Sequence, residues 1–146
     1  NPGVKVRAFN HLLGECDVTV FATAAQAETY RHNFPRSLHD APFLLPTQGT
    51  ALRRSLEQWF EAEHIHPAVA AEVEDAALLQ VLGQEGLGLF AAPTVVEEEI
   101  RRQYRVQPVG RIAAVRERFY AISIDRKLKH PAVLAISKAA KGTLFS

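Results

Sequence analysis

The residues best suited to hold a small anion are Thr47, Gln48, Gly49 and Thr50, which come just before the most regular helical pattern in the chain. The N-terminus of a helix exposes backbone N–H groups and carries a partial positive charge. Gly49 would let the backbone approach a ligand, the three polar side chains would donate hydrogen bonds, and Arg54 follows one turn later. The same residues would also form an ordinary turn and N-cap, because the Thr50 hydroxyl can accept from a first-turn amide. The spacing alone leaves both interpretations open.

Acidic and histidine residues form two further candidate sites. Glu72, Glu74 and Asp75 could coordinate a hard cation such as Na⁺ or Ca²⁺. His64 and His66 could share a metal ion if their segment is extended, because side chains two positions apart in a strand point the same way. No third ligand is evident for the histidines, and a histidine at a helix end also interacts with terminal carbonyls. We therefore predict no metal and no cofactor, and keep the three carboxylates as cation candidates.

Nucleophilic catalysis has little support in this sequence. Cys16, the only cysteine, lies between Glu15 and Asp17, whose charges disfavour a thiolate. Ser123 falls in a predicted strand without an obvious base, and no Gly-x-Ser-x-Gly elbow is present. The Gly-Leu-Gly at 86–88 matches half of a dinucleotide fingerprint, but it precedes a strand instead of following one. These observations predict a protein without enzymatic activity.

The composition limits the possible partners. Lys plus Arg is 17 and Asp plus Glu is 16 in 146 residues, a net charge of +1, which is too balanced for a self-sufficient nucleic-acid-binding module. A single cysteine excludes a disulfide framework and fits a reducing compartment. No apolar run approaches the length needed to cross a bilayer. The chain begins with Asn1 and contains no methionine, so we expect it to be a segment of a longer protein.

Alternating strand and helix patterns predict an α/β fold with a mainly parallel sheet and helices on both faces. We expect strands over residues 4–13, 17–22, 41–45, 69–73, 87–92, 106–112 and 119–124. We expect helices over residues 24–32, 50–64, 75–84 and 94–103, and a last one from Pro131. The apolar run over 87–92 is typical of a strand buried on both faces.

Two helix starts have specific expectations. The helix over 50–64 should bury one apolar stripe formed by Leu52, Leu56, Trp59 and Phe60. The polar side chains of the same helix lie outside this stripe: Arg53, Arg54, Glu57, Gln58 and Glu61. Thr94 and Glu97 have the spacing of a capping box, in which each side chain bonds a backbone amide at the start of the next helix.

Three stretches carry a family resemblance: residues 45–60, residues 72–75 with 86–93, and residues 120–122 with 129–133. In order and spacing they resemble the effector-binding domain of LysR-type transcriptional regulators, from about residue 6 to the end of the chain. The segment Gly-Leu-Gly-Leu-Phe-Ala-Ala-Pro at 86–93 is typical of these domains generally. The Trp-Phe pair of the first stretch, the Glu-Asp pair and the ending His-Pro-Ala-Val suggest the NhaR-like subgroup, which activates sodium/proton antiporter genes.

The resemblance implies a fold like that of a type 2 periplasmic binding protein, with two α/β subdomains and an effector in the cleft between them. Residues 1–22 would supply strands that belong to, or cross from, the first subdomain. Residues 23–118 would form the second subdomain. Residues 119–146 would return a strand and a C-terminal helix toward the first, so that the domain is truncated at its N-terminus.

The same resemblance implies a non-catalytic, cytoplasmic sensor. The loop 47–50 would contribute to the effector site with Arg54 behind it, and Thr23 and Ala91 would lie toward the cleft. The effector would be a small molecule or ion, and for the subgroup the signal would be sodium or alkaline pH, with the three carboxylates as candidate sensors. The domain would associate with a second copy, contact DNA only through an N-terminal domain absent from this chain, and not contact membranes. A solute-binding protein of a transport system, or a small α/β hydrolase or transferase, is the alternative.

Overall fold

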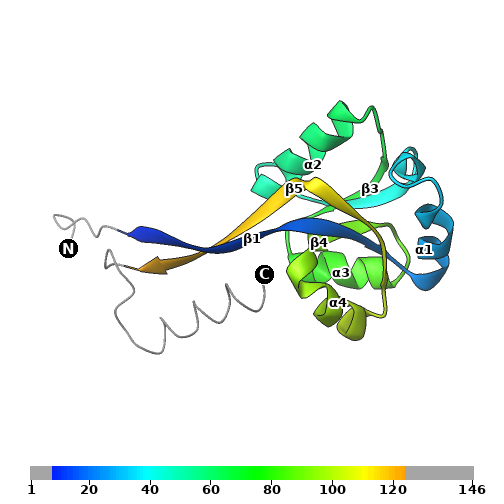
Figure 1. Ribbon diagram of the computed structural model, residues 1–146. Coiled ribbons are helices and arrows are strands. Elements are labelled where there is room, and N and C mark those ends of the chain that lie inside the picture. The colour runs from blue at the N-terminus through cyan, green and yellow to red at the C-terminus, as the bar shows by residue number, and fades with distance from the viewer. Residues whose placement is uncertain (1–7, 124–146) are drawn as a thin grey trace. The chain divides into compact units, whose positions relative to one another are not determined.

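The computed structural model describes residues 8–123 (Figure 1). These residues fall into two compact units, of which the larger is Asp17–Glu117. The other unit is described over residues 8–16 and 118–123. The helix expected from Pro131 lies outside the described residues, and the subdomain boundaries expected from the resemblance stay a prediction. No helix within residues 8–123 is long and apolar enough to span a membrane.

Within residues 8–123, five strands and four helices alternate (Figure 1). The strands are β1 (Phe9–Ala22), β2 (Pro42–Pro46), β3 (Ala68–Val73), β4 (Phe90–Pro93) and β5 (Gln107–Ser123). The helices are α1 (Ala24–Arg31), α2 (Ala51–Ala62), α3 (Ala76–Gln84) and α4 (Glu97–Tyr104), with short 3-10 turns η1 (Arg36–Leu38) and η2 (Thr94–Val96). The α/β class is therefore confirmed.

The neighbours of β2 on both sides run parallel to it. This strand is parallel to β3, and a parallel bridge joins Phe43 to Leu89, just before β4. This bridge joins the two-stranded β2-β3 sheet to a three-stranded sheet of order β4-β1-β5. Within it β1 is antiparallel to β4, with Val18 opposite Pro93 and Phe21 opposite Phe90.

Two expected strand breaks are absent. β1 is continuous from Phe9 to Ala22, where two strands joined near Gly14 were expected, and β5 is continuous across residues 113–118. Cross-strand partners explain the continuity, because a neighbouring strand supplies hydrogen bonds that local sequence does not reveal. In the smaller unit Arg118 Nε lies 3.1 Å from a Glu15 carboxylate oxygen, and His11 Nε2 lies 3.1 Å from Ser123 Oγ. Ser123 therefore does have a histidine beside it, which its sequence neighbours did not indicate.

The core has two hydrophobic clusters, one on each face of the sheet. Alternate residues of β4 enter opposite clusters: Leu89 and Ala91 pack with one, and Phe90 and Ala92 pack with the other. The prediction that residues 87–92 form a strand buried on both faces is confirmed for residues 89–92, whereas Leu87 is 54% exposed and β4 begins at Phe90. α2 adds Leu56 and Phe60 to the first cluster, and α3 and α4 add Leu79, Ile100 and Tyr104 to the second, so helices cover both faces.

The close approach of α3 to β4 yields a stability prediction. Gly83 lies in α3, and a Cβ at this position would fall on the ring of Phe90, which is fully buried and stacked on Phe21 at 5.5 Å. We expect Gly83→Ala to lower the free energy of unfolding by about 1–3 kcal/mol, since overpacking outweighs the better helix propensity of alanine. Urea unfolding measures the change. In a Phe90→Leu background the same substitution should cost less, and an equal cost in both backgrounds would contradict the proposed clash.

Candidate functional site

The carboxyl ends of β2, β3 and β4 meet at one edge of the sheet, because these strands run in the same direction. The loop 47–50 follows β2 at this edge, Glu74 and Asp75 follow β3, and Thr94 follows β4. Asp17 joins them from β1, because that strand is antiparallel to β4 and Val18 lies opposite Pro93. In open α/β sheets, ligands bind outside the carboxyl ends of the strands, so this edge is the candidate site.

The loop 47–50 forms an exposed turn that leads directly into α2. Gly49 has a φ of 95°, a left-handed conformation that glycine adopts without strain. The Thr50 hydroxyl caps α2: it accepts a hydrogen bond from the Arg53 amide at 3.2 Å and donates one to the Thr47 carbonyl at 3.2 Å. The predicted N-cap is thus confirmed. Gln48, Gly49, Thr50 and Ala51 are exposed, and the amides of Ala51 and Leu52, unlike that of Arg53, have no hydrogen-bond partner within residues 8–123, so the start of α2 opens to solvent.

Arg53 and Arg54 differ in burial, although both were expected off the apolar stripe of α2. Arg54, the predicted site residue, is exposed and donates to the Gly49 carbonyl at 3.0 Å, so it braces the turn. Arg53 was expected off the apolar stripe, yet only 5% of it is exposed. Sequence reasoning missed Arg53 because periodicity marks apolar faces, not a charge that is buried beneath half-exposed partners such as Glu57 and Glu72.

The Arg53 guanidinium joins three elements at the candidate edge. It donates to the Pro46 carbonyl at the end of β2 at 2.8 Å, to Glu57 on α2 at 2.7 Å and to Glu72 on β3 at 3.1 Å. Burial alone would lower the pKa of Arg53, but the hydrogen bonds and charges of the two glutamates outweigh it and hold the pKa above its usual value. Arg53 is therefore charged at every physiological pH and fixes the backbone from which the loop 47–50 starts.

A polar cluster that the sequence did not predict lies where β4 ends. The Thr94 hydroxyl donates to Asp17 Oδ1 at 2.5 Å and lies 2.8 Å from the Thr19 hydroxyl. Thr19 is completely buried and also donates to Glu97 at 3.4 Å. A threonine within the apolar run Val-Thr-Val-Phe-Ala was the available signal, because a buried hydroxyl requires a partner.

The predicted capping box of Thr94 and Glu97 is wrong. α4 begins at Glu97 with Val96 as its N-cap residue, no side chain caps it, and Thr94 starts the 3-10 turn before it. The Thr94 hydroxyl is engaged by Asp17 and Thr19 instead. The Thr94 hydroxyl therefore bonds two residues of β1 and does not cap α4.

Thr23 and Ala91 do not lie with the loop 47–50. Thr23 directly follows β1 at the opposite edge of the sheet, level with Pro42, and Thr47 is five positions further along β2, roughly 16 Å away. Its side chain caps α1 by accepting from the Gln26 amide at 3.2 Å. Ala91 lies in the middle of β4, opposite Val20, and is 8% exposed.

The cation candidates do not converge. Glu72 is bonded to Arg53, and Asp75 caps α3 by accepting from the amides of Ala77 and Leu78 at 2.8 and 3.2 Å. Glu74 is exposed. Across residues 8–123 the structure brings together no group of three or more His, Cys, Asp or Glu side chains that could hold a metal ion, and this includes His64 and His66.

The Arg53 network predicts different effects for two neighbouring arginines. Arg53→Met should lower the free energy of unfolding by about 1–3 kcal/mol, because the Pro46 carbonyl loses its donor and two glutamates lose their counter-charge. Arg54→Met, the matched control, should change it by less than about 0.5 kcal/mol, because Arg54 is exposed. Urea denaturation of the two variants measures both values. Equal effects would show that the buried network does not anchor this edge.

Comparisons with known proteins identify the family of this chain. Residues 10–144 match the family model described as the LysR substrate binding domain. The chain is 31% identical over 138 residues to the transcriptional activator protein NhaR of Escherichia coli, which covers 94% of this chain and 45% of that protein. The chain thus spans less than half the length of this relative.

Two solved structures share the fold. The regulatory domain of Synechocystis PCC6803 CcmR, in complex with 2-PG, superposes with a TM-score of 0.63 at 12% identity, covering 100% of this chain and 73% of that one. The bromide-bound regulatory domain of Salmonella typhimurium HypT gives 0.64 at 12% identity, covering 96% and 68%. These neighbours have the periplasmic-binding-protein-like arrangement expected from the sequence. The chain belongs to the LysR substrate-binding domain family, whose members are regulators and not enzymes.

Proposed function

We propose that this chain is the effector-sensing domain of a cytoplasmic transcriptional regulator, and that a small anion binds at the carboxyl edge of its sheet. One observation carries the proposal: the exposed first amides of α2 and the turn at Gly49 lie at this edge, on a backbone fixed by buried Arg53. Free helix amides and a flexible glycine turn favour negative charge. Relatedness to a transcriptional activator supports regulation over solute transport or hydrolysis.

Sensing requires that the effector prefer one arrangement of the domain over another. The candidate edge is suited to this, because Asp17 and Thr19 belong to β1, and β1 includes residues of both compact units. An effector that changed the hydrogen bonds of the Asp17–Thr94 pair would act directly on this shared strand. Effector binding at this edge would then affect the other unit, because β1 is part of both.

DNA contact belongs to a part of the regulator outside this chain. The chain carries a net charge of +1, which gives little attraction for a polyanion. It also aligns with only 45% of the related activator, which leaves most of that protein's length for other functions.

The signal that the subgroup resemblance implies is sodium or alkaline pH. Glu72 and Asp75 are already engaged by Arg53 and by α3, so the three acidic candidates are less suited to a cation than the loop 47–50 is to an anion. A sodium response of the regulator would then arise elsewhere or through an anion that accompanies the cation.

Self-association would use the outer face of α3. Leu78 and Val81 lie one turn apart on this helix and are 51% and 42% exposed. Adjacent exposed apolar side chains are typical of a surface that another protein covers. A two-fold axis over α3 would bury both residues in both copies.

Replacing these side chains by charge should dissociate the proposed dimer. We expect Leu78→Glu and Val81→Glu each to weaken dimerisation of the chain at least tenfold, because a carboxylate would be buried at the interface. Analytical ultracentrifugation measures the dissociation constant. The control is Ala76→Glu, an exposed position on the same helix that faces away from Leu78. A monomeric wild-type chain would refute this surface.

Acetate serves as the probe for the anion site. In NMR titrations at constant ionic strength, sodium acetate should produce saturable shifts of the amides of residues 48–52, with sodium chloride as the reference. Thr50→Ala should weaken acetate binding about fivefold, because the turn 47–50 loses the hydrogen bonds of the Thr50 hydroxyl to Thr47 and Arg53 that hold its amides in place. The matched control is Thr23→Ala, which removes another threonine N-cap at the opposite edge of the sheet.

Both variants should lose about 1 kcal/mol of stability from the missing cap, so their difference in affinity isolates the site. Absence of shifts at residues 48–52, or an equal loss of affinity in Thr23→Ala, would refute a site at this edge.

A further inference from the structure

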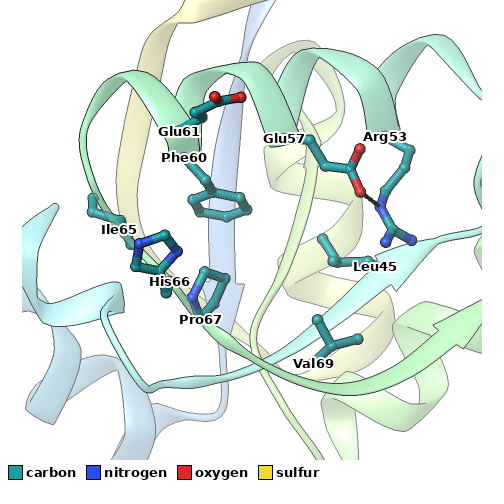
Figure 2. Close-up of a pocket in the computed structure, with 9 residues that line it drawn as sticks. All are labelled: Leu45, Arg53, Glu57, Phe60, Glu61, Ile65, His66, Pro67 and Val69. Carbon is teal, nitrogen blue, oxygen red and sulfur yellow. Dashed lines mark hydrogen bonds and ion pairs between the residues drawn. The ribbon is translucent and has the colours of Figure 1, made fainter.

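A cavity lies beside α2, on the side that faces β3. It has a volume of about 420 Å³ and opens between α2 and the first residues of β3 (Figure 2). Pockets of this size accommodate small organic molecules. β3 pairs only with β2 in the described part of the chain, so this side of the sheet ends in an open edge.

The base of the cavity is apolar and well packed. Leu45, Phe60 and Ile65 line it and are 2%, 5% and 1% exposed, so they are fixed in the core. Figure 2 shows the Phe60 ring at the centre, between α2 and the strand that carries Val69. Phe60 packs edge-on against Phe43 at 5.5 Å, which holds the ring in place. This surface can bury the apolar body of a ligand.

The rim along α2 is acidic. Glu57 and Glu61 both line the cavity and lie one helical turn apart. Arg53 is the only lysine or arginine in the lining, and its charge is shared by Glu57 at 2.7 Å and by Glu72 at 3.1 Å. Within residues 8–123 the Glu61 carboxylate makes no hydrogen bond or ion pair, so its charge is uncompensated.

We propose that this cavity binds an organic ammonium ion that carries an apolar group. The ammonium would lie between Glu57 and Glu61 near the Phe60 ring, where carboxylates and an aromatic quadrupole both attract a cation. The apolar group would cover Phe60 and Val69. An anionic ligand would be repelled, because Arg53 is outweighed by its partners Glu57 and Glu72 and Glu61 adds a further negative charge; His66 also lines the cavity but carries no charge when neutral. The proposal does not depend on the anion site at the turn 47–50.

The probe is 2-phenylethylammonium, titrated into the whole chain. Trp59, the only tryptophan, reports binding through its fluorescence, because its ring centre lies 5.4 Å from that of Phe60. We expect a saturable change, with 2-phenylethanol and 3-phenylpropionate binding at least fivefold more weakly than the ammonium. Equal affinity for the alcohol would overturn the proposal, because the carboxylates would then contribute nothing.

Two matched variants locate the binding. Glu61→Gln should weaken 2-phenylethylammonium about three- to fivefold, the effect of one partly exposed charge pair. Glu28→Gln makes the same change at an exposed position of α1 and should leave the affinity unchanged. Thr50→Ala should also leave it unchanged, which separates this cavity from the anion site. If Glu61→Gln binds the ammonium as tightly as the wild-type chain, the proposal is wrong.

Discussion

The candidate edge of this domain depends on one buried charge. Arg53 is 5% exposed and connects β2, α2 and β3 through Pro46, Glu57 and Glu72. A guanidinium can do this because its donors point in fixed directions within one plane. A buried charge without partners would be strongly destabilising, so the three acceptors and Arg53 must be present together. Because this network fixes the end of β2, it also fixes the position of the turn 47–50 that follows.

A second polar network fixes the same edge from the other side. Thr19, Thr94 and Asp17 connect β1 to the end of β4 through hydrogen bonds of 2.8 and 2.5 Å. The two networks lie on strands that are neighbours through β4, and both satisfy polar groups that the hydrophobic core would otherwise leave unpaired. Between them, the first amides of α2 open to solvent, and the Glu74 carboxylate, an acceptor, is also exposed at this edge. This contrast between satisfied and open donors is what favours a ligand site there.

The two faces of α2 serve different purposes in the proposals. Its N-terminus presents amides and an exposed turn, which suit an anion, whereas its middle presents Glu57 and Glu61 beside an aromatic ring, which suits a cation. Arg53 takes part in both regions. Its guanidinium forms an ion pair with Glu57 beside the cavity, and its amide donates a hydrogen bond to the Thr50 hydroxyl at the helix N-terminus. A single helix can therefore support two sites of opposite charge preference.

The sequence by itself determined the local features: the amphipathic α2 with its cap at Thr50, the doubly buried β4 and the family resemblance. Each depends on residues close in the chain, where periodicity and capping chemistry act. Only the tertiary structure decided that β1 and β5 are unbroken, that Thr94 bonds Asp17 and Thr19 instead of capping α4, and that Thr23 lies at the opposite edge from Thr47. It also decided that Arg53 is buried while Arg54 is exposed. The physical reason is that strand direction, and the partners of buried polar groups, come from residues distant in sequence, which no local pattern encodes.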